Sequence, residues 1–136
     1  LVDLGRPMAA AEELIAAFAT AAPPEQREAR LTMLFLGVLE MGNGERSRVI
    51  DRIKRYAQGQ KSLAERIAAD NARLHGIRLD IAPEDQPPEI QEVRQRRDWD
   101  LRVFDDRMSM LAQVCDQPVL LEQRVFALAR AIQGYL

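Results

Sequence analysis

Residues 49–74 read VIDRIKRYAQGQKSLAERIAADNARL, and residues 90–115 read IQEVRQRRDWDLRVFDDRMSMLAQVC. In both segments mostly apolar residues recur at steps of three and four, the spacing of a helix face that packs along another helix over several turns. A proline-rich connection separates them, so we expect the two helices to fold back on each other. The first stripe comprises Val49, Ile53, Tyr56, Gln60, Leu63, Ile67, Asp70 and Leu74, and the second comprises Ile90, Val93, Arg97, Leu101, Phe104, Met108, Leu111 and Cys115.

The residues before this hairpin predict two further helices. The first covers about residues 8–21 and is stopped by Pro23-Pro24, and the second runs from there to about Met41. Gly42-Asn43-Gly44 then forms a strong break, with Gly42 placed to adopt the left-handed conformation that ends many helices.

At the other end, Pro118 either kinks the last helix or starts a separate one that continues to Leu136. The predicted fold class is therefore all-α. We expect a four- or five-helix bundle built on a long antiparallel helical hairpin of about residues 45–75 and 88–116, with residues 1–136 as a single all-helical domain.

The composition is that of an ordinary globular protein. Of 136 residues, 47% are hydrophobic and 29% are charged, so disorder is not expected. The formal net charge of -2 gives no global reason to expect nucleic acid or an anionic membrane. Aromatic residues make up only 5%, which favours closely packed helices over a β-sandwich.

The single cysteine and the lack of a sufficiently long apolar stretch favour a cytoplasmic protein without a membrane span. The first residue, Leu1, is not methionine, which leaves open whether residues 1–7 belong to the native protein. A cleaved secretory signal would also produce such a start, so a periplasmic location is the minority alternative.

The register of the hairpin follows from pairing Leu74 with Ile90. Asp70 and Arg97 then lie about one turn apart on facing stripes, where we expect them to form an ion pair that sets the register. Cys115 is expected to be a buried small hydrophobic residue. The predicted core residues are Phe35, Val38, Ile53, Leu63, Phe104, Leu111 and Leu128.

A cluster of basic residues runs from Arg46 to Arg55, at the start of the predicted third helix. Arg48, Arg52 and Arg55 share one face, and positive charge at a helix N-terminus opposes the helix dipole. The simpler interpretation is a solvated face. The alternative is a nucleic-acid-binding regulator that uses these three arginines.

Trp99, the only tryptophan, lies in a charged stretch. It either packs under the connecting loop against Leu79 and Ile81, which we favour, or stands exposed as a binding anchor beside Arg94 and Arg97. These five residues form the candidate partner-binding site. Arginines and aspartates four residues apart predict a solvent face laced with salt bridges: Arg94 with Asp98, Arg96 with Asp100, and Arg102 with Asp106.

Motifs with defined chemistry are missing from the sequence. His75, the only histidine, is explained by the helix dipole, and it lacks the companions that a zinc site requires. There is no phosphate-binding glycine loop and no hydrolase or metalloprotease motif. We therefore expect a non-enzyme without cofactor or metal: a protein-protein interaction module, such as a regulator, adaptor or small chaperone. It would act through amphipathic helices on an unidentified protein partner, with a homo-oligomer possible.

Overall fold

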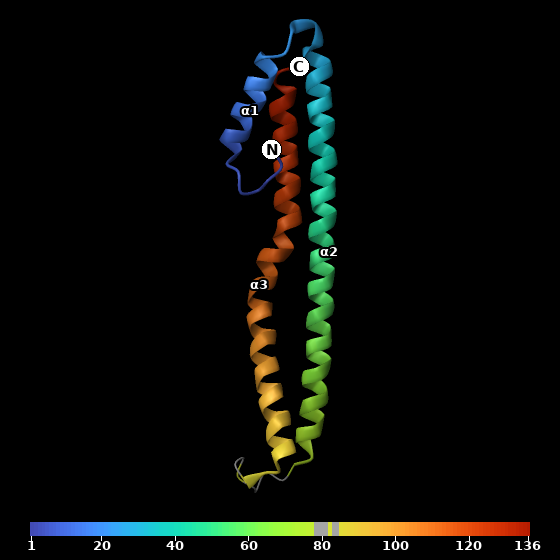
Figure 1. Ribbon diagram of the computed structural model, residues 1–136, viewed down its shortest axis with the longest axis vertical. Coiled ribbons are helices and arrows are strands. Elements are labelled where there is room, and N and C mark those ends of the chain that lie inside the picture. Colours follow the sequence, from blue (N-terminus) through green and yellow to red (C-terminus); the bar gives the residue numbers. More distant parts are fainter. Residues whose placement is uncertain (78–81, 83–84) are drawn as a thin grey trace. The chain divides into compact units, whose positions relative to one another are not determined.

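The computed structural model describes residues 1–77, 82 and 85–136, and within these residues the chain is helical without strands. Helix α1 spans Met8–Thr20, the short 3-10 helix η1 spans Pro24–Gln26, α2 spans Arg27–His75 and α3 spans Pro88–Gln133 (Figure 1). The predicted all-α class is confirmed. Most of the connection between α2 and α3, including Leu79 and Ile81, lies outside the described residues.

The chain forms two compact units, and each is described by itself. Unit 1 comprises Leu1–Arg52 and Asp116–Leu136, and unit 2 comprises Ile53–Cys115. The long helices α2 and α3 contribute to both units. Unit 1 therefore contains α1 and parts of α2 and α3. Unit 2 contains only parts of α2 and α3, which form a hairpin.

The core of unit 1 is formed by α1 packing on α2 and α3. Arg30 of α2 lies over the ring of Phe18 of α1, 5.2 Å from its centroid. Ahead of α1, the carbonyl oxygen of Leu1 accepts a 2.8 Å hydrogen bond from Nε of Arg124. The core of unit 1 is a cluster of buried hydrophobic residues from all three helices and from the segment before α1. Its buried members are Val2, Ala11, Ile15, Ala19, Leu31, Val38, Leu121, Leu128 and Ile132.

The predicted break at Gly42-Asn43-Gly44 is wrong, because α2 continues through all three residues. No glycine in the described part of the chain has a positive φ, so the helix-ending conformation expected at Gly42 is not adopted. Gly42 is buried instead, and a Cβ built on it would lie 2.5 Å from Cγ2 of Val125 on α3. The glycine is therefore explained by a close approach of two helices rather than by a turn.

Pro118 does not divide the last helix either, since α3 runs through it to Gln133. Proline lacks an amide hydrogen, so one hydrogen bond of the helix is lost, but its fixed φ is compatible with a helix. Because neither predicted break divides a helix, the number of helices is lower than predicted. The described residues form three α-helices and one 3-10 helix rather than a bundle of four or five helices.

Unit 2 confirms the predicted antiparallel hairpin. The Tyr56 hydroxyl donates to the carbonyl oxygen of Arg107, and Nε2 of Gln60 donates to the carbonyl oxygen of Phe104 at 3.2 Å. Later on α2 and earlier on α3, Nη2 of Arg66 donates to Oδ1 of Asp100. Residue numbers fall on α3 as they rise on α2, within about two residues of the predicted register.

The two predicted apolar stripes differ in how deeply their residues are buried. The α2 stripe faces α3, with Leu63 and Ile67 buried, whereas on α3 Leu101 and Met108 are 38% and 44% exposed. Cys115 is exposed, so its predicted burial is wrong. Of the predicted core residues, Val38, Leu63 and Leu128 are buried, and Phe35, Ile53, Phe104 and Leu111 are half-buried.

Candidate interaction surfaces

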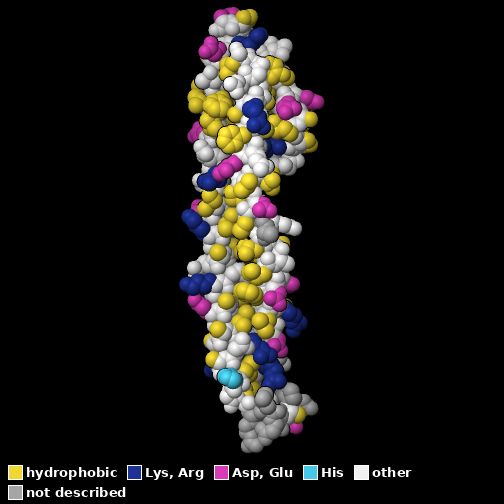
Figure 2. Space-filling view, turned by 180° about the vertical axis from the view of Figure 1, so that it is seen from behind, with side chains coloured by type: hydrophobic (Ala, Val, Ile, Leu, Met, Phe, Trp, Pro, Cys, Tyr) yellow, Lys and Arg dark blue, Asp and Glu magenta, His cyan; other side chains and the backbone are white. Residues whose placement is uncertain are grey.

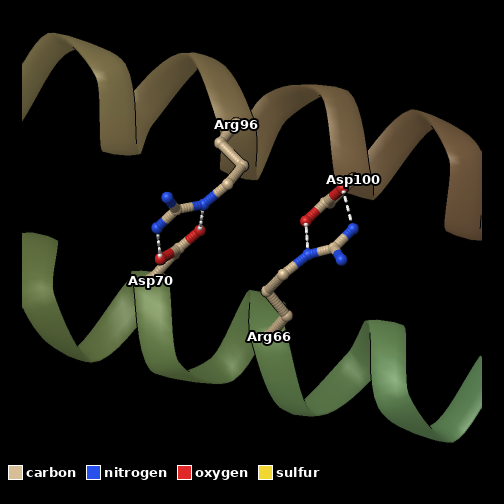
Figure 3. A network of polar contacts seen from close by, with 4 residues as sticks. All are labelled: Arg66, Asp70, Arg96 and Asp100. Atoms are coloured by element: carbon tan, nitrogen blue, oxygen red, sulfur yellow. Dashed lines mark hydrogen bonds and ion pairs between the residues drawn. The ribbon is translucent and has the colours of Figure 1, made fainter.

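Four charged side chains join α2 and α3 in unit 2 (Figure 3). Nε and Nη2 of Arg66 donate to the two carboxylate oxygens of Asp100, the second at 2.6 Å. In the same way, Arg96 on α3 donates to both oxygens of Asp70 on α2, with Nε at 2.8 Å. Each helix therefore contributes an arginine and, four residues later, an aspartate, and the antiparallel arrangement exchanges the partners.

The two carboxylates of this quartet are buried, with Asp70 and Asp100 only 2% and 3% exposed. Hydrogen bonding by Arg96 holds the pKa of Asp70 below its usual range, and hydrogen bonding by Arg66 does the same for Asp100, although burial opposes both shifts. Both carboxylates are thus kept ionised. A bidentate arginine–carboxylate pair is geometrically specific, so the quartet sets the register of the hairpin.

The quartet corrects two predicted ion pairs. Asp70 pairs with Arg96 rather than with Arg97, whose Nε and Nη2 donate to Oδ1 of Asp98 at 2.9 and 2.6 Å. Asp100 faces α2 and is not a partner of Arg96 on a solvent face. The predicted apolar stripe of α3 runs through the hydrophobic neighbours of Asp100, so this charged residue of the helix contact lies beside the stripe.

The candidate site around Trp99 is only partly described. Trp99 is 63% exposed, so its predicted packed position is wrong. Arg94 donates to Oε1 of Gln86 at 2.7 Å and is half-buried. Trp99 and Arg97 are two positions apart, about 200° around the helix, and therefore point to different sides. The other two members, Leu79 and Ile81, lie outside the described residues.

The basic cluster at the predicted nucleic-acid site is largely paired with carboxylates. Nη1 of Arg48 and Nη2 of Arg52 lie 2.8 and 3.0 Å from the two oxygens of Glu45. Nε of Arg46 lies 2.6 Å from Glu122 on α3. We missed Glu45 as the partner of these arginines, although its spacing of three residues from Arg48 was visible in the sequence.

Arg48 and Arg52 also line a hollow of about 740 Å³ in unit 1, and Arg55 is exposed on the continuation of α2. The hollow carries both signs of charge, because Glu40 and Glu45 line it as well. A surface that attracts phosphates strongly would be dominated by positive charge.

A second hollow in unit 1, which we call the apolar groove, has a volume of about 410 Å³. It lies between α2 and α3, and Figure 2 shows hydrophobic side chains gathering over this part of unit 1. Phe126 on its wall is 66% exposed, and Arg46 and Glu122 add a charged pair to its lining. The lining residues are Phe35, Leu39, Gly42, Asn43, Arg46, Leu121, Glu122, Val125, Phe126 and Ala129.

Within residues 1–77, 82 and 85–136, every helix lacks the sustained apolar stretch that a bilayer span requires. The same residues contain no group of three or more His, Cys, Asp and Glu side chains arranged to hold a metal ion. The chain matches no protein-family model, no curated protein and no solved structure.

Proposed function

We propose that this protein is a non-catalytic interaction module that binds α-helices of protein partners through apolar faces of α2 and α3. The apolar groove of unit 1 is the observation that carries the proposal. It combines a largely exposed phenylalanine, Phe126, with half-buried Phe35, Leu39 and Val125. Large exposed apolar patches mark interaction sites, and aromatic anchors dominate binding energy in such patches.

The shape of the groove favours a helical partner. It runs between two helices, and an amphipathic helix that lies in such a groove buries its apolar face against both walls. The pair of Arg46 and Glu122 supplies a polar rim, in which Arg46 can donate hydrogen bonds to the partner and Glu122 can accept them.

Phe126→Glu tests this proposal, and Ser47→Glu is its matched control. Both add one carboxylate to an exposed helical position in unit 1, but Ser47 does not line the groove. Tagged wild-type and variant proteins are used to retrieve partners from the native host, with quantification by mass spectrometry. We expect a partner that Phe126→Glu loses and Ser47→Glu retains. Equal retrieval by all three proteins would contradict binding in the groove.

Heparin chromatography separates this function from nucleic-acid binding. Because Glu45 pairs with two of the three arginines, we expect weak retention that hardly changes when Arg48, Arg52 and Arg55 become glutamine. Strong retention that falls steeply with salt and is lost in the triple variant would favour the nucleic-acid alternative.

A further inference from the structure

We propose that a second copy of this chain packs on the open apolar face of unit 2, so that two hairpins form an antiparallel four-helix bundle. This inference rests on the proposed function and names one partner for it. The open face lies on the side of the hairpin opposite the ion-pair quartet. It comprises Ala57, Ala64 and Ala68 of α2 and Leu101, Phe104, Met108 and Cys115 of α3.

The position of this face follows from the quartet and the helical repeat. On α2, the steps from Asp70 to Ile67 to Ala64 each turn about 60° across the contact line with α3. On α3, the step from Arg96 to Phe104 turns about 80° and the step from Phe104 to Met108 turns about 40°. Because the helices are antiparallel, these steps lead toward the same side of the hairpin as the steps from Asp70 to Ala64 on α2. Since Asp70 and Arg96 lie at one edge of the contact, the alanines and Met108 lie together at the other edge.

Exposure shows that most of this face is apolar and uncovered. Arg97, which lies at the same helical angle as Cys115, is a charged residue on the face and pairs with Asp98. Leu101 and Met108 are 38% and 44% exposed, and Cys115, seven residues beyond Met108, is also exposed. Ala57 and Ala64 are exposed at the same seven-residue spacing on α2. Figure 2 shows hydrophobic side chains in a band along unit 2, with charged side chains on both sides. This is the residue pattern of a helix-packing seam.

The direction of the α3 stripe distinguishes a bundle from a lone hairpin. In a two-helix hairpin, the apolar stripe should point directly at the partner helix, but on α3 Val93 shares that position with Asp100, and the two residues are 8% and 3% exposed. The centre of the stripe lies between Phe104 and Cys115, about 60° around the helix from Asp100. In a four-helix bundle each stripe points between its two neighbouring helices, toward the bundle axis.

The size of the face matches a stable dimer. The α2 part of unit 2, residues 53–75, is about 35 Å long at 1.5 Å per residue. Two helices side by side are about 20 Å wide, so the face covers about 700 Å² per copy. A standard specific interface buries about 800 Å² per partner. The hairpin by itself therefore offers close to the necessary area.

Charge complementarity favours a two-fold axis parallel to the helices. Residues 53–75 contain five basic and two acidic residues, whereas residues 88–115 contain five basic and six acidic residues. A parallel axis places the α2 part of each copy beside the α3 part of the other. Every neighbouring pair of helices is then antiparallel and pairs a basic with a more acidic segment. Cys115 of the two copies then lies on the same level across the axis.

Two methionines provide the test. Met108 lies on the open face, and Met110, which is 58% exposed, is turned about 200° from it. Sedimentation equilibrium and light scattering should show a dimer of the full chain. Met108→Glu should raise the dimer dissociation constant at least about tenfold, as loss of an interface anchor does, while Met110→Glu should leave it unchanged. Circular dichroism verifies that both variants remain helical.

A crosslink keeps the inference testable if Met108→Glu fails to fold. A short bis-maleimide should join two copies through the exposed Cys115, and should fail when the thiol is moved to an exposed position on the far side by Cys115→Ser with Gln113→Cys. A wild-type monomer at about 100 µM would overturn the inference, because a standard interface is populated there. So would a dimer weakened by Met110→Glu alone, or one that Cys115 does not crosslink. A monomer that still retrieves partners through Phe126 would leave the proposed function standing.

Discussion

Replacing Gly42 by alanine tests whether α2 and α3 approach as closely as the structure shows. In an exposed helix interior, a change from glycine to alanine stabilises by about 1 kcal/mol, because alanine loses less backbone entropy on folding. At Gly42 the added Cβ would meet Cγ2 of Val125 at 2.5 Å. Overpacking of this kind costs about 1–3 kcal/mol. We therefore expect a net destabilisation of about 0–2 kcal/mol.

Gly44 is the matched control, because it lies in the same helix and a Cβ there meets nothing within 4 Å. Gly44→Ala should stabilise by about 0.5–1 kcal/mol, so the two variants should differ by about 1–3 kcal/mol. Urea unfolding followed by circular dichroism at one protein concentration measures both. If Gly42→Ala stabilises as much as Gly44→Ala, the close approach at Val125 is refuted.

A double variant separates steric overlap from other causes. Val125→Ala removes the methyl group that the new Cβ would meet. In that background, Gly42→Ala should no longer destabilise, and the coupling between the two substitutions should be favourable. Additive effects would mean that the cost at Gly42 has another origin.

Three further predictions concern the core, the ion pairs and the tryptophan. Leu128→Ala removes a side chain with 0% exposure and should cost about 2–5 kcal/mol in urea unfolding, whereas Leu120→Ala, at 49% exposure, should cost less than about 1 kcal/mol; similar costs would argue against the unit 1 core. The pKa of Asp70 is lowered in the folded state, so its contribution to stability is present above an unfolded pKa of about 3.9 and is lost as pH falls below it toward the folded pKa. Asp70→Asn should therefore lower the urea midpoint at pH 7 and reduce its fall between pH 5 and 3, and an unchanged fall would contradict the ion pair with Arg96. Because Trp99 is 63% exposed, Trp99→Ala should change the free energy of unfolding by about 0.5 kcal/mol or less, and a large fall in melting temperature would show that the residue is structural.

The hairpin was predictable because helix packing leaves a periodic trace in the sequence. The α2 stripe from Ile53 to Leu74 faces α3 as expected, and the register was within about two residues. The spacing of apolar residues indicates which side of a helix is shielded from water. This side depends only on residues that are close in sequence. The same reasoning placed Val38, Leu63 and Leu128 in the interior.

Local signals were misleading where tertiary contacts compete with them. Gly42 and Pro118 are residues that commonly end helices, yet both lie inside long helices. At Gly42 the reason is visible, because the missing side chain is what admits Val125. Turn propensity amounts to about 1 kcal/mol, and the packing of a long helix exceeds it.

The sequence by itself determined the helical class, the antiparallel hairpin and the apolar face of each long helix, since all three depend on local periodicity. Only the tertiary structure decided which residues meet across the helices. The spacing of Arg96 and Asp100 suggested a pair on one helix, but packing against α2 gives each of them a bidentate partner on the other helix. An ion pair depends on the rotation of both helices about their axes, and one helical sequence does not contain the rotation of the other.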